Sequence, residues 1–188
     1  MPWIALVLAI AVVVGLLRGG KLRNLTEVRV RSWWLLLVGF GIQIGASFLP
    51  ASRHSLAVSI VLASYLPLLL FVWLNRSFAG MWIAGIGILM NFTVIAINTG
   101  MPVSEEAVML AGGGGGELVL DAKYVLLDQA TRLPFLADII PLPGSVISLG
   151  DVFLAIGAAV FLEDQLRQPV RLFAHGVQGE PGSAARQS

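Results

Sequence analysis

The sequence contains no cysteine in its 188 residues, only two histidines, and charged side chains at only 12% of its positions. Without cysteine there are no disulfides, thiolate nucleophiles or iron–sulfur ligands. The two histidines lie in dissimilar surroundings, so no metal site or cofactor is expected. An ordinary soluble domain carries roughly 25% charged residues. The sequence therefore does not read as a soluble globule.

Hydrophobic residues are abundant instead: they make up 57% of the chain, and the mean hydropathy is +0.86. This composition predicts a small integral membrane protein whose main partner is the lipid bilayer. The net charge of +1 gives no reason to expect a nucleic-acid partner. No P-loop or cluster of metal-ligating residues is present, which argues against ATP-driven and metal-based catalysis.

Apolar segments predict an all-α membrane domain over residues 1–163 with five transmembrane helices. The expected spans are residues 2–17, 32–49, 55–74, 78–98 and 146–162. No basic residue precedes the first segment and no small-residue cleavage site follows it, so we expect a retained span rather than a signal peptide. Residues 164–188 are expected to form a cytoplasmic tail that begins amphipathic and ends disordered.

Basic residues predict the orientation of these spans. Nine of the twelve lie between the first and second spans, between the third and fourth, or after the fifth. Basic loops stay on the cytoplasmic side. The N-terminus and the long loop over residues 99–145 should therefore lie outside the membrane, and the C-terminus should lie inside.

The outer loop is expected to be structured. Apolar residues between Asp121 and Leu133 are spaced as in an amphipathic helix lying at the membrane surface. Five consecutive glycines, Gly112–Gly116, predict a spacer or flap. Two prolines and a glycine near residue 143 predict an extended return to the fifth span.

Few polar side chains lie within the spans. Asn91 and Asn98 are two helical turns apart and share a face. Gln43 and Asn91 are expected first of all to form hydrogen bonds between helices. The pair Gly41 and Gly45, and the row Gly80, Ala84 and Gly87, are expected to let helices approach closely.

Asp151 is the one acid inside a predicted span, about two turns from its start. One interpretation is an acid near a helix N-terminus, capped by Ser145 or Ser148. The other is a carboxylate facing a wet outer cleft, because an ionised group inside a membrane is costly.

Several motifs together resemble a known family. They are Asn98-Thr-Gly-Met-Pro-Val, Lys123-Tyr124, Thr131, Asp138-Ile-Ile-Pro141-Leu-Pro143 and Ser148-Leu-Gly-Asp151. On these residues the chain resembles domain of unknown function 5317, a family of small bacterial multi-pass membrane proteins. The resemblance implies a location in a bacterial inner membrane and assigns no chemistry.

A second resemblance is to lipoprotein signal peptidase, a membrane aspartyl peptidase. That family has an Asn-x-Gly motif at an outer helix end, an extracytoplasmic loop and two catalytic aspartates. Asn98-Thr-Gly100, Asp138 and Asp151 follow in a similar order here. The resemblance implies that Asp138 and Asp151 form a catalytic pair oriented by Asn98.

Three hypotheses follow for the function. The leading one is a non-enzymatic protein with an outward-facing polar cleft that binds or transports a small solute or a lipid headgroup. The cleft residues would be Asn91, Asn98, Thr131, Ser148 and Asp151. The second is a membrane aspartyl hydrolase that uses Asp138 and Asp151. The third is an assembly subunit whose outer loop docks a membrane-protein partner.

Overall fold

A computed structural model describes residues 2–112 and 122–168, which are mostly helical. Five helices account for most of the described residues. They are α1 (Pro2–Leu17), α2 (Trp34–Ser47), α3 (His54–Leu74), α4 (Met81–Asn98) and α6 (Leu149–Arg167). Each overlaps one apolar segment of the sequence, and α1 begins and ends where the first segment does.

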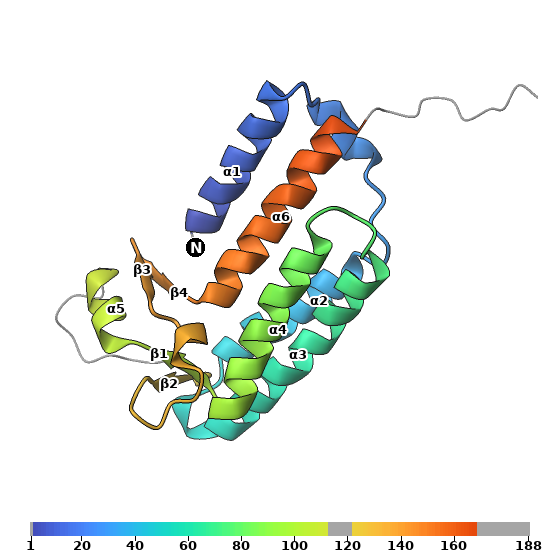
Figure 1. The fold of residues 1–188 in the computed structure, drawn as a ribbon. Helices are drawn as coiled ribbons and strands as arrows, with labels where there is room; N and C mark the ends of the chain where they lie inside the picture. Colours follow the sequence, from blue (N-terminus) through green and yellow to red (C-terminus); the bar gives the residue numbers. More distant parts are fainter. Residues whose placement is uncertain (1, 113–121, 169–188) are drawn as a thin grey trace, which may run out of the picture.

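The five helices pack side by side in an order that differs from their order in the chain. The main contacts join α1 to α6, α6 to α4, α4 to α3, and α3 to α2. Figure 1 shows α6 between α1 and α4, with α2 beside α3. The last long helix in the sequence is therefore next to the first, and most apolar core residues lie between α2, α3 and α4.

Glycines bring α4 and α6 together. A methyl group added at Gly80, Gly87 or Gly157 would overlap backbone atoms of the opposite helix. The predicted close-packing role of the Gly80, Ala84 and Gly87 row is thereby confirmed. The same prediction is wrong for Gly41 and Gly45, because no atom of the described residues lies within 4 Å of a methyl group added at either position.

The connection between α4 and α6 contains strands, so the expectation of an all-α chain is wrong. Strand β1 (Met101–Val103) pairs in parallel with β2 (Tyr124–Leu126). Strand β3 (Ile140–Leu142) pairs antiparallel with β4 (Ser145–Ile147). Short 3-10 turns complete the structure at Leu22–Glu27, Ala51–Arg53 and Pro134–Leu136.

The amphipathic helix expected over residues 121–133 is also wrong where the chain is described. Tyr124, Val125 and Leu126 favour a strand, and a buried partner strand is available in β1. The loop does contain a helix, α5 (Glu105–Leu110), at a different place. It begins at Ser104, whose side chain accepts a hydrogen bond from Ala107 N, and has two acids in its first turn.

The fifth apolar segment also differs from its expected limits. Residues 146 and 147 belong to β4, and α6 continues to Arg167, so the boundary expected at 163/164 falls inside a helix. The helix continues because Leu166 is fully buried against the end of α1, and its carbonyl oxygen accepts hydrogen bonds from Lys21 N and the Asn24 side chain. The expectations for Gly113–Gly116 and for residues 169–188 lie outside the described residues.

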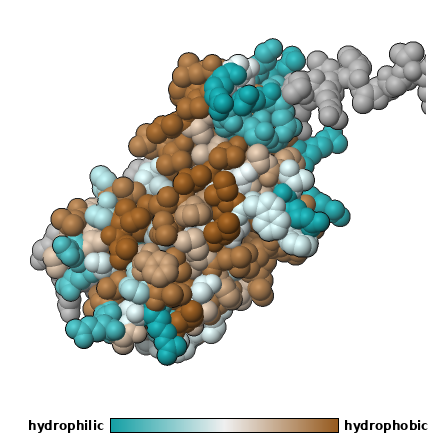
Figure 2. Space-filling model, viewed as in Figure 1, coloured by the Kyte–Doolittle hydropathy of each residue, from teal (hydrophilic) through white to brown (hydrophobic). Residues whose placement is uncertain are grey.

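Within the described residues, two helices are long and apolar enough to cross a membrane: Ala51–Leu74, which includes α3, and Met81–Asn98, which is α4. Trp3–Leu17 and Trp34–Ser47 are apolar but shorter. Figure 2 shows hydrophobic residues along the length of the helices and hydrophilic residues gathered towards the ends.

Candidate functional site

The backbone of Asp138 lies along β1, on the side opposite β2. Asp138 N donates a hydrogen bond to Pro102 O at 2.8 Å, and Ser104 N donates one to Asp138 O at 2.9 Å. Because all three residues of β1 are buried, the main chain of Asp138 is fixed in the interior of the loop.

The Asp138 side chain is buried without a partner for one of its oxygens. The residue is 5% exposed, and its Oδ1 has no hydrogen-bond partner in the part of the chain that the structure describes. The pKa of the carboxyl is raised to about 8, chiefly because burial removes it from water and secondly because of the Asp151 charge, whereas Lys123 lowers it. Asp138 is therefore mostly protonated at neutral pH.

Asp151 is hydrogen-bonded through both of its oxygens. It is the third residue of α6 rather than two turns inside it, which confirms the interpretation of an acid near a helix N-terminus capped by Ser148. Ser148 Oγ accepts a hydrogen bond from Asp151 N at 3.0 Å, and Asp151 Oδ2 accepts one from Ser148 N at 3.1 Å. Together these two bonds form a capping box.

Asn91 connects this cap to α4. Its Nδ2 donates to Asp151 Oδ1 at 2.8 Å, and its Oδ1 accepts from Ser148 Oγ at 2.8 Å. Asn91 and Ser148 are both buried, so the hydrogen bonds replace water that neither side chain can reach. A methyl group at Gly150 would overlap the Asn91 amide. The three cleft residues Asn91, Ser148 and Asp151 thus come together as an interhelical junction.

Asn98 and Thr131 make separate contacts. Asn98 Oδ1 accepts from Arg132 N at 2.8 Å, while its Nδ2 donates to Val94 O and Arg132 O, both at 2.9 Å. Thr131 Oγ1 donates to Asp128 Oδ1 at 3.0 Å and accepts from Asp128 N at 2.9 Å. Asn98 holds the loop to the end of α4, and within the described residues no hydrogen bond joins it to Asp138 or Asp151.

Aromatic and basic residues from other elements complete the surroundings of Asp138. Lys123 Nζ lies 4.9 Å from the centroid of the Tyr124 ring. Tyr65 of α3 interacts electrostatically with Asp138, Asp151 and Tyr124, and its ring packs edge-on against Phe92. Sequence analysis did not identify Tyr65, because no sequence pattern distinguishes a functional tyrosine in an apolar helix from one that only packs there.

His54 was also missed. Its Nδ1 lies 2.7 Å from Ala122 O and its Nε2 lies 2.8 Å from Thr99 O. Both ring nitrogens face acceptors, so the ring donates to both only in its doubly protonated form. His54 thereby fastens the start of α3 to the end of α4 and to the segment before β2.

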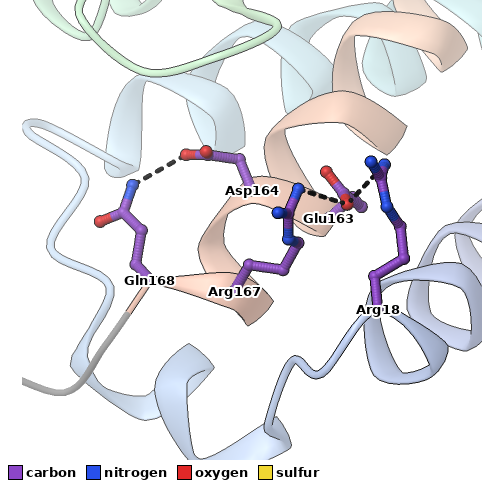
Figure 3. A network of polar contacts seen from close by, with 5 residues as sticks. All are labelled: Arg18, Glu163, Asp164, Arg167 and Gln168. Carbon is purple, nitrogen blue, oxygen red and sulfur yellow. Dashed lines mark hydrogen bonds and ion pairs between the residues drawn. The ribbon is translucent and has the colours of Figure 1, made fainter.

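The opposite end of the bundle has a different kind of polar network. Glu163 Oε1 lies 3.1 Å from Arg18 Nη1 and 3.3 Å from Arg167 Nη1, and the Gln168 side chain donates to Asp164 (Figure 3). Both arginine side chains are about half exposed. These contacts lie near the surface and join the end of α1 to the end of α6. In the described residues no group of three or more His, Asp or Glu side chains could hold a metal ion.

Comparison with known proteins places the sequence in a group without an assigned activity. An uncharacterised protein of Thermotoga maritima is 30% identical over 148 residues, which are 76% of this chain and 80% of that protein. No solved structure matches. The model of a family of unknown function, DUF5317, matches residues 27–163, and the chain belongs to that family.

Proposed function

We propose that the chain is a multi-pass membrane protein whose five long helices cross the bilayer, and that it binds a small solute or a lipid headgroup at a polar site on its outer side. Asp138 is the central residue of this site. The observation that carries the proposal is the unpartnered oxygen of a carboxyl group that is almost completely buried.

The exposed apolar side chains support the membrane location. Every one of the five helices exposes large hydrophobic residues, each between 46% and 64% exposed in the examples Leu6, Ile44, Leu66, Leu89 and Ile156. Because the helices contact mainly their neighbours in a row, each keeps an uncovered face. In water these faces would be unfavourable, whereas lipid chains cover them at no such cost.

Tryptophan and arginine positions support the direction of insertion. Trp33, Trp34, Trp73 and Trp82 are all more than half exposed, and they lie at the start of α2, the end of α3 and the start of α4. Arg76 stacks on Trp73 at 4.3 Å from the ring centroid. Aromatic residues mark membrane interfaces and basic residues mark the cytoplasmic side. Asp138 is in the connection at the other end of α4 and α6, so it faces outward.

The orientation can be tested directly because the natural chain contains no cysteine. Glu106→Cys and Ser77→Cys place single thiols at two exposed positions, in α5 and in the turn between α3 and α4. A membrane-impermeant maleimide added to intact cells should label only the first variant. Both should be labelled after the membrane is permeabilised. Labelling of Ser77→Cys in intact cells would contradict the proposed orientation.

The free acceptor supports a binding role for Asp138. An unpartnered buried acceptor costs about 1–3 kcal/mol, and a donor on a bound molecule would remove that cost. In contrast, both carboxylate oxygens of Asp151 accept hydrogen bonds within the protein. We therefore place the contact with the ligand at Asp138 and give Asp151, with Asn91 and Ser148, the role of holding α4 and α6 beneath it.

A full-chain binding comparison tests this site. Native mass spectrometry of the wild type should detect a co-purified small molecule or lipid that Asp138→Asn does not retain. Asp128→Asn is the matched control, because Asp128 is an exposed acid of the same loop, and it should retain the molecule. Identical spectra for all three proteins would overturn the proposed site and leave the docking of a protein partner as the role of the loop.

A membrane aspartyl hydrolase is the second candidate, favoured by the electrostatic interaction between the two aspartates. The charge of Asp151 helps to raise the pKa of Asp138, and two carboxyl groups that interact in this way can act together as a general acid and a general base. In that case Asp138→Asn and Asp151→Asn would each abolish hydrolysis of membrane substrates while the protein stays folded. Hydrolysis that persists in Asp138→Asn would exclude this candidate.

A further inference from the structure

We infer that the group bound at Asp138 is a primary ammonium, carried by a free amine or by an ethanolamine-type lipid headgroup, which enters in exchange for the proton on the Asp138 carboxyl. This inference rests on the proposed function and names its ligand class. In the exchange, the carboxyl O–H bond breaks, its proton leaves to water, and the resulting carboxylate accepts hydrogen bonds from the ammonium.

The geometry leaves an acceptor for such a group. Both backbone hydrogen bonds of Asp138 are made to β1 and to Ser104, which holds the residue in place. Its Oδ1 is buried and has no partner among the described residues. The described residues contain no ion pair between Lys123 and Asp138. The Lys123 ammonium therefore does not pair with the Asp138 carboxyl, which is left free to accept hydrogen bonds from a bound cation.

The surroundings suit an ammonium group. The Lys123 ammonium already lies against the Tyr124 ring, which is the contact that aromatic faces make with cations. Tyr65 approaches from α3 and Asp151 from α6, and both interact electrostatically with this region. A carboxylate with nearby aromatic rings is a common setting for organic cations.

The charge balance distinguishes a cation from an anion. The charged groups that face Asp138 are Asp151 from α6 and Lys123 from the segment before β2, while Tyr65 and Tyr124 are neutral at pH 7. With Asp138 protonated, the negative charge of Asp151 and the positive charge of Lys123 cancel. Replacing the proton by a monocation preserves this balance, whereas an anion would leave a net negative charge in a buried site.

The apolar neighbours of Asp138 bring a lipid within reach. Phe135 is 58% exposed and Ile139 is 39% exposed, and they lie on either side of Asp138 in the sequence. A loop that exposes such side chains at the outer end of the helices can rest on the bilayer surface. A headgroup ammonium is then as accessible as a dissolved amine, so the experiment includes both sources.

Calorimetry on the detergent-solubilised full chain tests the inference. The probes are ethanolamine and dihexanoyl-phosphoethanolamine, each paired with its quaternary counterpart, choline or dihexanoyl-phosphocholine, which has no N–H donor. Titrations at each pH in two buffers that act at that pH, differ in ionisation enthalpy and contain no ammonium or imidazolium group count the protons released. Asp138→Asn is the test variant and Asp128→Asn is the matched control.

The expected result is binding of at least one primary-ammonium probe with release of nearly one proton at pH 6 and almost none at pH 9. Below pH 8 the affinity should fall about tenfold for each pH unit, because only the ionised fraction of Asp138 binds. Asp138→Asn should lose at least about tenfold in affinity, since it replaces a charge-assisted hydrogen bond, while Asp128→Asn should be unchanged. Preference for the free amine or for the lipid identifies the source.

Three outcomes would overturn the inference: equal binding of the quaternary probes, binding without proton release at pH 6, or unchanged affinity in Asp138→Asn. Failure of both primary-ammonium probes to bind would do the same. If the wild type still retained a co-purified molecule that Asp138→Asn loses, the ammonium assignment alone would fail. If Asp138→Asn retained that molecule too, the proposed site would fail with it.

Discussion

Asp138 and Asp151 belong to the same end of the molecule, but the fold gives their carboxyl groups opposite surroundings. At the junction of α4 and α6, Asp151 accepts one hydrogen bond on each oxygen and closes a capping box. In the loop beside β1, Asp138 is more deeply buried, and one of its oxygens has no partner among residues 2–112 and 122–168. The Asp151 carboxyl joins α4 to α6, whereas the Asp138 carboxyl can accept a hydrogen bond from a molecule outside the chain.

Among the changes considered, we expect disturbance of the α4–α6 junction to lower the stability of the protein most. Gly150→Ala would place a methyl group onto the Asn91 amide, so either α6 moves away or the network breaks. We expect a loss of about 3 kcal/mol or more in the free energy of unfolding. Thermal unfolding of the full chain in detergent measures it.

Gly41→Ala is the matched control for this experiment. The position is exposed on α2 and has open space around it. Alanine is also the better helix former by up to about 1 kcal/mol. The variant should therefore be as stable as the wild type or slightly more stable. Similar losses in the two variants would show that glycine itself, and not the α4–α6 contact, accounts for the effect.

Removing the Asp151 carboxyl is expected to be the next most damaging change. Asp151→Ala leaves Asn91 Nδ2 and Ser148 N without their acceptors, for a cost of about 2–3 kcal/mol. Asp128→Ala, at an exposed position of the loop, should cost less than about 1 kcal/mol. Unfolding midpoints of the two variants, compared at pH 7, check the difference. If Asp151→Ala were as stable as the wild type, Asp151 would not have the structural role that distinguishes it from Asp138.

The pH dependence of stability should identify Asp138. Its pKa of about 8 lies above the ordinary value of 3.8, so the folded state holds a proton that the unfolded state has lost over this interval. The contribution of Asp138 to stability should consequently be greatest near and below pH 4 and should be lost as the pH rises to 8. The slope is at most about 1.4 kcal/mol per pH unit.

Asp138→Asn should remove the part of the pH dependence of stability that comes from the Asp138 carboxyl. Compared with the wild type, the variant should gain stability between pH 5 and pH 9, and Asp128→Asn should follow the wild-type curve. Unfolding midpoints measured at several pH values, in buffers free of amines, provide the comparison. Parallel curves for Asp138→Asn and the wild type would mean that Asp138 is ionised in the folded protein.

Sequence patterns identified the helices well because their signals are local. The continuous apolar segments gave α1 and, to within three residues, the ends of α2, α3 and α4. Ser148 and Asp151, three residues apart, were expected as one possible helix start, and the structure confirms it. The row Gly80, Ala84 and Gly87 was also a local pattern.

The parts that sequence analysis missed depend on contacts between distant residues. The apolar spacing around Tyr124 fits a helix, and only the pairing with β1, more than twenty residues earlier, makes this segment a strand. Gly41 and Gly45 have the same spacing as residues that pack closely, but no helix lies against them. Likewise, nothing in the sequence around Asp138 shows that its carboxyl is buried beside Lys123 and within the field of Asp151.

The smallest effect is expected at the far end of α6. Glu163 pairs with Arg18 and Arg167, whose side chains are 59% and 46% exposed. Pairs of this kind contribute about 0.2–1 kcal/mol and weaken in salt. Glu163→Gln keeps the size of the side chain and removes only its charge. The variant should differ slightly from the wild type at low salt and not at all at 0.5 M salt, in unfolding midpoints measured side by side. A large loss that persists in high salt would mean that this ion pair, like the Asp151 junction, is needed to hold α1 against α6.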